Sequence, residues 1–251
     1  MVRAVVSICR GWAALLAAGG CAVLLCAGPA AGANRDALRQ IVQDQCLRHW
    51  REQHSAAPCE ELRVEDAPRG YAVLADRKGG AHFLLIPTRS ISGIESPALL
   101  EPGAENYFWE AWKERVRLAA VVGHPIADSL VGLAVNPPHA RSQDQLHIHI
   151  ECLRRDVLRA LERDSARITA AWMSIAIGRA DYYVRKVPQD LEHRDPFKLL
   201  AEHMPGSGGT LADYTLIVAC PGKGPGFLML ASTQSAGELL LDSTCAAAAA
   251  A

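Results

Sequence analysis

The chain has 251 residues, and 50% of them are hydrophobic, which is enough apolar content for one large domain or two small ones. Its formal net charge at pH 7 is -1, so the sequence excludes the overall basic field with which many proteins bind nucleic acid. A local anion site is compatible with this balance, because a few side chains are enough to form one.

The first 33 residues have the pattern of a secretory leader. Two arginines precede an apolar run over residues 12–27, and small residues that end in Ala33 follow it, as in a signal peptide cleaved after an A-x-A site. The run is shorter than the roughly 20 residues of a membrane-spanning helix, but uncharged residues extend it, so a retained anchor stays open. Cys21 is a weaker indication of a lipoprotein site. The sequence predicts that residues 34–245 form a domain exported to the periplasm or the extracytoplasmic face of the cell membrane.

The exported part contains five cysteines, and export places them where disulfides form. Cys46 and Cys59 enclose a short loop, so they are the first expected pair. Cys152 is then available for Cys245, which leaves Cys220 unpaired. Metal binding is the alternative use of cysteine, but the sequence has no C-x-x-C spacing.

The first half of the exported part predicts two helices and a hairpin. Residues 36–50 have apolar positions at helical spacing. Residues 71–75 and 82–87 are rich in β-forming residues and flank a turn with two glycines, which predicts a hairpin. A long amphipathic helix is predicted over residues 105–122, ending before Gly123.

The second half continues with strands and one more helix. We expect a strand over residues 130–135, a loop with two prolines over 136–144, and a second strand over 145–153. A helix is expected over residues 156–172, with Asp156 as its N-cap.

The C-terminal third echoes the first hairpin. Residues 214–218 and 227–230 are similar in pattern to 71–75 and 83–86, with a Gly/Lys turn in between. The echo indicates either an ancient duplication or two independent hairpins built from the same β-forming residues. The alanine run 246–251 is of low complexity, and we assign it no function.

The stretch from Gln145 to Ile150 is the most informative part of the chain. As a strand it places Gln145, His147 and His149 on one face, and the other face carries Leu146, Ile148 and Ile150. Residues two apart on a strand are about 6.5–7 Å apart, so two imidazoles can meet one small anion. One ring could then attack a phosphorus atom while the other binds its oxygens.

Several segments together resemble the histidine-triad superfamily of nucleotide hydrolases. The run from His82 to Pro87 resembles its hairpin strand, and Asn136, Arg141 and the strand that ends in His149 resemble its active-site segment. Within the superfamily, the chain most closely resembles the CDP-diacylglycerol pyrophosphatase family, over residues 37–42, 45–47, 108–112 and 146–152. The resemblance covers most of the exported part, and the ordered set of segments is more specific than the histidine segment alone.

The resemblance implies an α+β fold in which a bent antiparallel sheet, pseudo-duplicated if the echo is a duplication, carries packed helices. It implies hydrolysis of CDP-diacylglycerol to CMP and phosphatidate through a nucleotidyl-histidine intermediate, without a cofactor. His147 corresponds to the nucleophile, and His149 to the histidine that supports the phosphate and the leaving oxygen. The family pattern has a histidine where this chain has Gln145, which can donate a hydrogen bond but cannot protonate a leaving group.

Five further residues are expected to bind the substrate phosphates, on the resemblance and on their side-chain chemistry. They are His82, Asn136, Arg141, Ser142 and Gln145. The planar guanidinium suits phosphate oxygens without a metal. His147 and His149, with His82 or Asp144, could bind zinc, but a cation would occupy the lone pair of the nucleophile, so we expect no metal requirement.

Other interpretations stay open. The substrate is either the lipid nucleotide at a membrane surface or a soluble nucleotide diphosphate, and Gln145 leaves room for a domain that binds nucleotide or lipid without catalysis. Trp109 and Trp112 lie three apart on a predicted helix, where core packing competes with contact to lipid or cytosine. Members of the superfamily often form homodimers, but a duplication would supply the second half within one chain.

Overall fold

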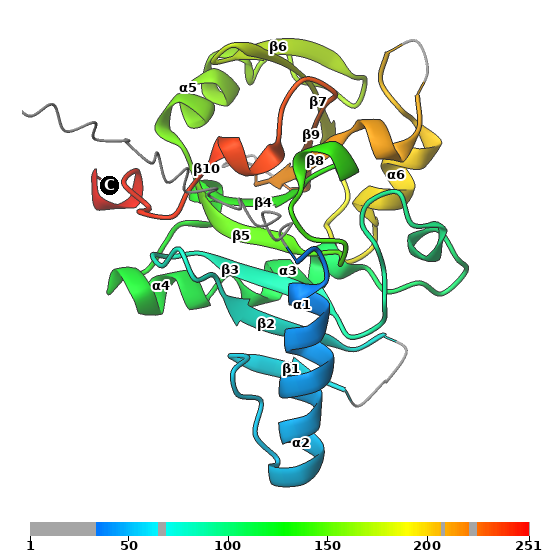
Figure 1. The fold of residues 1–251 in the computed structure, drawn as a ribbon. Coiled ribbons are helices and arrows are strands. Elements are labelled where there is room, and N and C mark those ends of the chain that lie inside the picture. The colour runs from blue at the N-terminus through cyan, green and yellow to red at the C-terminus, as the bar shows by residue number, and fades with distance from the viewer. Residues whose placement is uncertain (1–33, 65–68, 207–208, 221–224, 251) are drawn as a thin grey trace, which may run out of the picture. The chain divides into compact units, whose positions relative to one another are not determined.

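The computed structural model describes residues 34–64, 69–206, 209–220 and 225–250 (Figure 1). The predicted leader lies outside these residues. In the described part, each helix is too short or too polar to cross a membrane.

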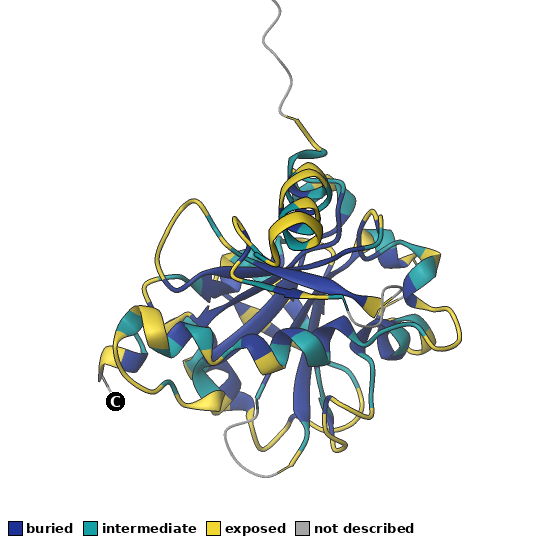
Figure 2. Cartoon of the chain, turned by 90° about the horizontal axis from the view of Figure 1, so that it is seen from below, coloured by how far each residue is buried: buried dark blue, intermediate teal, exposed yellow. Residues whose placement is uncertain are grey.

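The described strands form one antiparallel sheet, which confirms the α+β class. Every strand pairs with antiparallel neighbours, and β10 (Leu241–Asp242) pairs with β5 beside the main path. The spatial order is β1 (Glu61–Arg63), β2 (Tyr71–Ala75), β3 (Phe83–Pro87), β5 (Ile148–Leu153), β4 (Val131–Val135), β8 (Thr215–Ala219), β9 (Phe227–Ser232), β7 (Ala180–Val187) and β6 (Met173–Ile177). Figure 2 shows that the strands are largely buried, with exposed residues on the helices and loops around them.

One face of the sheet carries His149. Leu84 of β3 and Ala134 of β4 are the cross-strand partners of His149, so their side chains share its face. We call this the histidine face. Ile148 and Ile150 belong to the opposite face and lie in the core there, as the alternation predicts.

The N-terminal helix packs on the histidine face. It runs through α1 (Ala37–Gln40), a π-helical segment η1 (Ile41–Cys46) and α2 (Leu47–Gln53), so the predicted helix is confirmed and extends to Gln53. Its buried residues lie against apolar side chains of β2 and β3, the two sets being Leu38, Val42 and Cys46 against Ala72, Leu84 and Ile86. The expected disulfide Cys46–Cys59 ties the helix to the loop before β1.

Helices α3 (Tyr107–Glu114), α4 (Arg117–Val122) and α6 (Pro196–Glu202) contribute to the core of the opposite face. The single helix expected over 105–122 is therefore wrong in detail, because the chain turns at Arg115 and Val116. There the amide of Arg115 bonds the carbonyl of Trp112 three residues back, and its guanidinium reaches Asp128. Gly123 ends α4 with φ 82°, as predicted for a C-terminal glycine.

The helix expected over 156–172 is shorter than predicted. Helix α5 (Arg155–Asp164) begins after Arg154, and Asp156 lies in its first turn, where it pairs with Arg154 instead of capping the helix. The chain beyond Asp164 leads into the β6–β7 hairpin, which our reading of the sequence missed. The signal available in the sequence was the alternation of Met173, Ile175 and Ile177 with smaller residues, followed by Gly178.

The C-terminal segment contacts β5, the strand that carries His149, which we call the histidine strand. The second expected disulfide, Cys152–Cys245, joins it to β5 directly, and β10 pairs with the same strand. The alanine run that follows is partly integrated, since Ala248 is 9% exposed and belongs to the core. Cys220 is free, as predicted.

Candidate functional site

A cavity of about 460 Å³ opens on the histidine face. The N-terminal helix forms one wall, and the β2–β3 turn and the loop after β4 form others. Its lining combines a polar and an apolar group of side chains: Asp76, Arg77, Lys78, Asn136, Arg141, Ser142, Gln143, His147, His149 and Glu238, with Ala37, Leu38, Ile41, Leu74, Leu84 and Ala140. His147 and His149 therefore project into one shared cavity, as their spacing predicts.

The strand expected over 145–153 begins at Ile148, so His147 lies just before β5, where the backbone of Gln145 orients its ring. Its Nδ1 lies 2.7 Å from the carbonyl oxygen of Gln145, and a carbonyl only accepts, so Nδ1 carries the hydrogen. The lone pair then lies on Nε2. Burial lowers the pKa of the ring, which keeps it neutral near pH 7. Such a ring is suited to nucleophilic attack.

His149 and His82 form a stacked pair beside His147. Their ring centroids are 5.2 Å apart with an interplanar angle of 26°, and Nε2 of His82 lies 3.0 Å from Nδ1 of His149. The other nitrogen of His149 is 3.5 Å from Oε2 of Glu238, a residue of η7 (Gly237–Leu240) that also lines the cavity. Burial lowers the pKa of both histidines. The structure thus brings together three of the predicted residues.

Glu151 completes this group and was missed from the sequence. It follows His147 and His149 in the same alternation, which was the signal that could have found it. Its Oε1 lies 3.1 Å from Nε2 of His82, and burial, reinforced by the nearby Glu238, raises its pKa to about 8. One ligand atom from each of His82, His149 and Glu151 can lie within 4.8 Å of the others, so this group could hold a metal ion. The 3.0 Å contact between His82 and His149 is a hydrogen bond, and the 3.1 Å contact with Glu151 uses the same Nε2 of His82, whereas Nε2 of His149 has no hydrogen-bond partner among the described residues.

Asn136 and Ser142 both line the cavity, as predicted. Asn136 is 3% exposed, and its Oδ1 accepts a hydrogen bond of 2.7 Å from the amide of Gly237. This bond fixes the start of η7 and thereby the position of Glu238 beside His149. The side-chain NH2 of Asn136 is the group that remains as a donor toward an anion.

Arg141 lines the cavity, but its guanidinium has protein partners that the sequence did not predict. It forms two hydrogen bonds with the carboxylate of Glu95, of 2.7 and 2.8 Å, and donates to Asp144 and to the carbonyl of Gln143. Four of its donor contacts are therefore made within the protein. This arrangement holds the loop after β4 in place, and direct phosphate binding by Arg141 stays a prediction.

Gln145 is also engaged with the protein. Its Nε2 donates to the carbonyl oxygens of Pro87 and Arg89, at 3.0 and 2.8 Å. These bonds join the segment before β5 to the end of β3 and the loop that follows it. Gln145 is 2% exposed and is not among the residues that line the cavity, so the phosphate contact expected for it has no support in this geometry.

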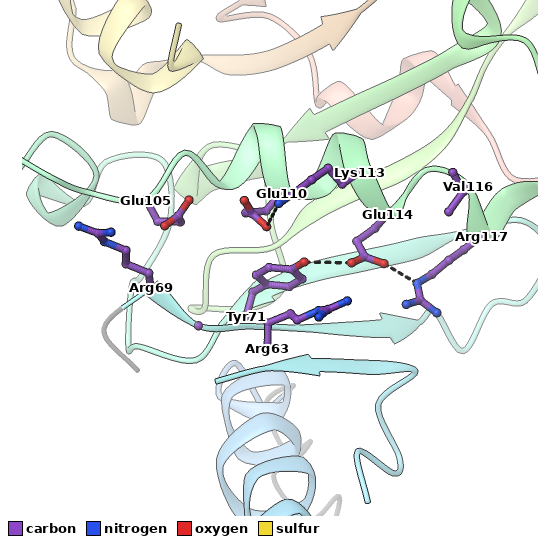
Figure 3. Close-up of a pocket in the computed structure, with 10 residues that line it drawn as sticks. Arg63, Arg69, Tyr71, Glu105, Glu110, Lys113, Glu114, Val116 and Arg117 are labelled. Carbon is purple, nitrogen blue, oxygen red and sulfur yellow. Dashed lines mark hydrogen bonds and ion pairs between the residues drawn. The ribbon is translucent and has the colours of Figure 1, made fainter. Parts of the chain in front are cut away.

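A larger cavity, of about 630 Å³, lies between α3, α4 and the β1–β2 end of the sheet (Figure 3). Figure 3 shows that several of its polar groups pair with one another: the hydroxyl of Tyr71 donates to Glu114 at 3.0 Å, and Arg117 donates to the same carboxylate at 2.7 Å. Lys113 pairs with Glu110 at 2.7 Å. Among the described residues that line this cavity there is no histidine, cysteine or serine that could act as a nucleophile.

Trp109 and Trp112 pack against the core of the opposite face. Lys113 lies over the ring of Trp109, and the guanidinium of Arg115 lies 4.3 Å from the centroid of Trp112. Neither tryptophan lines the histidine cavity, which favours core packing over contact with the substrate.

Comparison with known proteins identifies the family of this chain. A family model described as CDP-diacylglycerol pyrophosphatase matches residues 33–249. The chain is also 41% identical over 222 residues to the CDP-diacylglycerol pyrophosphatase of Yersinia pestis, with 84% of each chain covered. The residues matched by the family model include β5 and every described residue that lines the cavity on the histidine face. The chain therefore belongs to the CDP-diacylglycerol pyrophosphatase family.

Proposed function

We propose that this protein hydrolyses CDP-diacylglycerol to CMP and phosphatidate, with His147 as the nucleophile. The observation that carries the proposal is the bond from Nδ1 of His147 to the carbonyl of Gln145, which leaves Nε2 as the nitrogen with the lone pair in a residue that lines the cavity. Membership of the family supplies the substrate. The geometry supplies a neutral nucleophile beside a second imidazole.

The reaction proceeds in two displacements. Nε2 of His147 forms a bond to the phosphorus of the cytidine side while the bond from that phosphorus to the bridging oxygen breaks. The bridging oxygen keeps the electron pair and leaves with phosphatidate. Water then attacks the same phosphorus, the electron pair of the N–P bond returns to Nε2, and water loses a proton to His149 or to solvent.

His149 supports the leaving oxygen, and His82 with Glu151 positions it. Contact with Nε2 of His82 fixes the ring of His149 through Nδ1, so the remaining nitrogen is available on the side of Glu238. The amide of Asn136 and the hydroxyl of Ser142 are the neutral donors for the phosphate oxygens, and Arg141 holds the loop that carries Ser142. Donors that are fixed before substrate binds stabilise charge that develops during the reaction.

The fold is of the histidine-triad type, and the strand order supports a duplication. The order β2-β3-β5-β4 is followed by β8-β9-β7-β6. In each set a hairpin (β2–β3 or β6–β7) is followed along the chain by a second pair of strands (β4–β5 or β8–β9), whose later strand lies next to the hairpin. In this arrangement β2–β3 corresponds to β6–β7, so the sequence echo between β2–β3 and β8–β9 does not mark the repeat. A duplicated sheet provides both halves within one chain, so we propose that a monomer is the active unit and that a homodimer is not needed.

The apolar wall of the cavity accounts for a lipid substrate. Leu38, Ile41 and Leu74 lie beside the polar groups and suit the glycerol and the first methylenes of the acyl chains. Two disulfides fit an oxidising compartment, and the predicted leader fits export to the outer side of the membrane.

Replacement of the nucleophile tests the proposal. His147→Ala should lower kcat by at least about a thousandfold with thermal stability retained, because the covalent route is lost. Wild-type protein quenched during turnover should carry one CMP group on His147, as peptide mass spectrometry would show. Unchanged turnover of His147→Ala, or an adduct on another residue, would contradict the mechanism.

A substrate panel separates the lipid from soluble nucleotides. CMP release from CDP-diacylglycerol in mixed micelles is compared with release from CDP-glycerol and CDP-choline. The apolar wall predicts a higher kcat/KM for the lipid substrate. Equal or higher values for the soluble compounds would favour a soluble nucleotide diphosphate as the substrate, and no release from any of them would favour a domain that only binds.

A further inference from the structure

The cavity must neutralise a diphosphate, and the cation expected to do so is engaged elsewhere. The guanidinium of Arg141 is bonded to Glu95, Asp144 and the carbonyl of Gln143. Apart from the histidines, the remaining cations among the described residues that line the cavity are Arg77 and Lys78, in the turn between β2 and β3. Both are exposed, and neither side chain makes an ion pair or hydrogen bond with another described residue.

The turn that carries these two residues is held in place by a contact with the C-terminal segment around Ser243. Gly79 and Gly80 have φ of 76° and 77°, a conformation that favours glycine. The amide of Ala81 donates to the carbonyl of Ser243 at 2.7 Å, and a Cβ added to Gly80 would lie 2.6 Å from that same oxygen. Ser243 follows β10 and precedes Cys245, so the segment under the turn is bonded to the histidine strand. The turn is therefore a fixed support for cationic side chains.

The position of Lys78 distinguishes the two phosphates. The backbone amide of Lys78 donates to Oδ1 of Asp76 at 2.7 Å, and the same oxygen lies 3.8 Å from Nδ1 of His82, the ring that stacks on His149. Lys78 thus belongs to the side of the cavity where His82 and His149 lie and where His149 supports the leaving oxygen.

We infer that Arg77 and Lys78 form the binding site for the leaving phosphate, the one that departs as phosphatidate. This assignment rests on the proposed function of the same cavity. Each phosphate of the diphosphate carries one negative charge before the reaction, and the leaving phosphate gains a second when the bond to the bridging oxygen breaks. A lysine at that position binds the transition state more strongly than the substrate, so it contributes to kcat as well as to KM.

Inhibition by the two products tests the site. The full chain and the variants Arg77→Ala, Lys78→Ala and their combination are assayed on CDP-diacylglycerol micelles, with CMP and soluble dihexanoyl phosphatidate as inhibitors. The double variant should raise the inhibition constant of dihexanoyl phosphatidate by about tenfold or more and lower kcat by a similar factor. Its inhibition constant for CMP should change by less than about twofold. Lys78→Arg keeps the positive charge, so it should lose much less affinity for dihexanoyl phosphatidate than Lys78→Ala does.

The matched control is Arg179→Ala, in the exposed β6–β7 turn at the other edge of the sheet. It should leave kcat and both inhibition constants unchanged. That result would show that the loss of a positive charge at the micelle surface does not by itself weaken product binding. The assignment is overturned if the double variant leaves inhibition by dihexanoyl phosphatidate within about twofold of wild type, or if inhibition by both products weakens equally. If His147 were not the nucleophile, His147→Ala would continue to turn over substrate, so a failure of the proposed function can be told apart from a failure of this phosphate site.

Discussion

The protonation state of His147 controls the chemistry at the residue scale. Its Nε2 can attack phosphorus only while the ring is neutral, and burial among protein groups lowers its pKa below the ordinary histidine value of about 6.5. In the folded enzyme the ring becomes protonated only at a pH lower than that value. The cavity therefore keeps the nucleophile ready in mildly acidic conditions.

A pH profile of kcat/KM checks this. The acid limb should have its midpoint below about 6.5, because activity falls only when the pH drops through the lowered pKa of the free enzyme. The measurement is kcat/KM for CDP-diacylglycerol from pH 4 to 8, with circular dichroism at each pH to exclude unfolding. A midpoint at or above the ordinary histidine value would show that the ring is not desolvated as described.

The predictability of the site depends on how far apart the interacting residues lie in the chain. The shared face of His147 and His149 follows from two-residue alternation, and the hairpin brings His82 to the same place. The engagement of Arg141 with Glu95 was not predictable from a pattern, because the partners are 46 residues apart and belong to different loops. Gln145 donates to backbone carbonyls, which every residue possesses, so no sequence signal marks its partner.

At the scale of elements, the β2–β3 turn connects packing to catalysis. Its conformation depends on two adjacent glycines, of which only Gly80 lies against another segment, while space is open around Gly79. The strands of this hairpin were predictable because β-forming runs and a Gly-Gly turn are local features. The contact of the turn with Ser243 is long-range, and for this reason the sequence did not reveal it.

Substitution of each glycine tests the role of the turn. Gly79→Ala and Gly80→Ala share the same penalty for a positive φ, of about 1 kcal/mol in stability. Only Gly80→Ala must also displace Ser243, so it should lower kcat/KM by about tenfold relative to Gly79→Ala. Steady-state kinetics and thermal unfolding of both variants provide the measurement. Equal kinetics would show that the contact with Ser243 does not position the turn.

Elements governed by longer-range forces were predicted less well. Helix α5 stops at Asp164, and in the segment after it the carbonyl of Thr169 accepts a hydrogen bond of 2.7 Å from the amide of Lys186 in β7. The helical pattern itself continues past this point, so tertiary contacts override local propensity. The break between α3 and α4 has a similar origin in the bond from Arg115 to Asp128.

For the whole molecule, the two disulfides differ in what they constrain. Cys46–Cys59 closes a short local loop, whereas Cys152–Cys245 spans 93 positions and joins the histidine strand to the C-terminal segment. Both pairs were predicted from the number of exported cysteines and the short loop between the first two. In the chain-entropy model, the disulfide that closes the longer loop stabilises the folded state more.

Removal of each disulfide should show this difference. The double variant Cys152→Ser with Cys245→Ser should lose roughly 4–5 kcal/mol in the free energy of unfolding, and Cys46→Ser with Cys59→Ser roughly 3 kcal/mol. Urea unfolding under non-reducing conditions measures both. The first variant should also lose activity at temperatures where it stays folded, since the segment beneath Lys78 is released. Full activity of this variant at such temperatures would show that the disulfide does not position the site.

The pairing of β10 with β5 has a consequence for biosynthesis. Strand β5, which carries His149, pairs along part of one edge with residues 241–242, and these are synthesised after every other described strand. Folding that keeps pace with synthesis would therefore leave this part of the edge unpaired until β10 has been made. Folding that begins only once both segments are present would avoid the exposed edge.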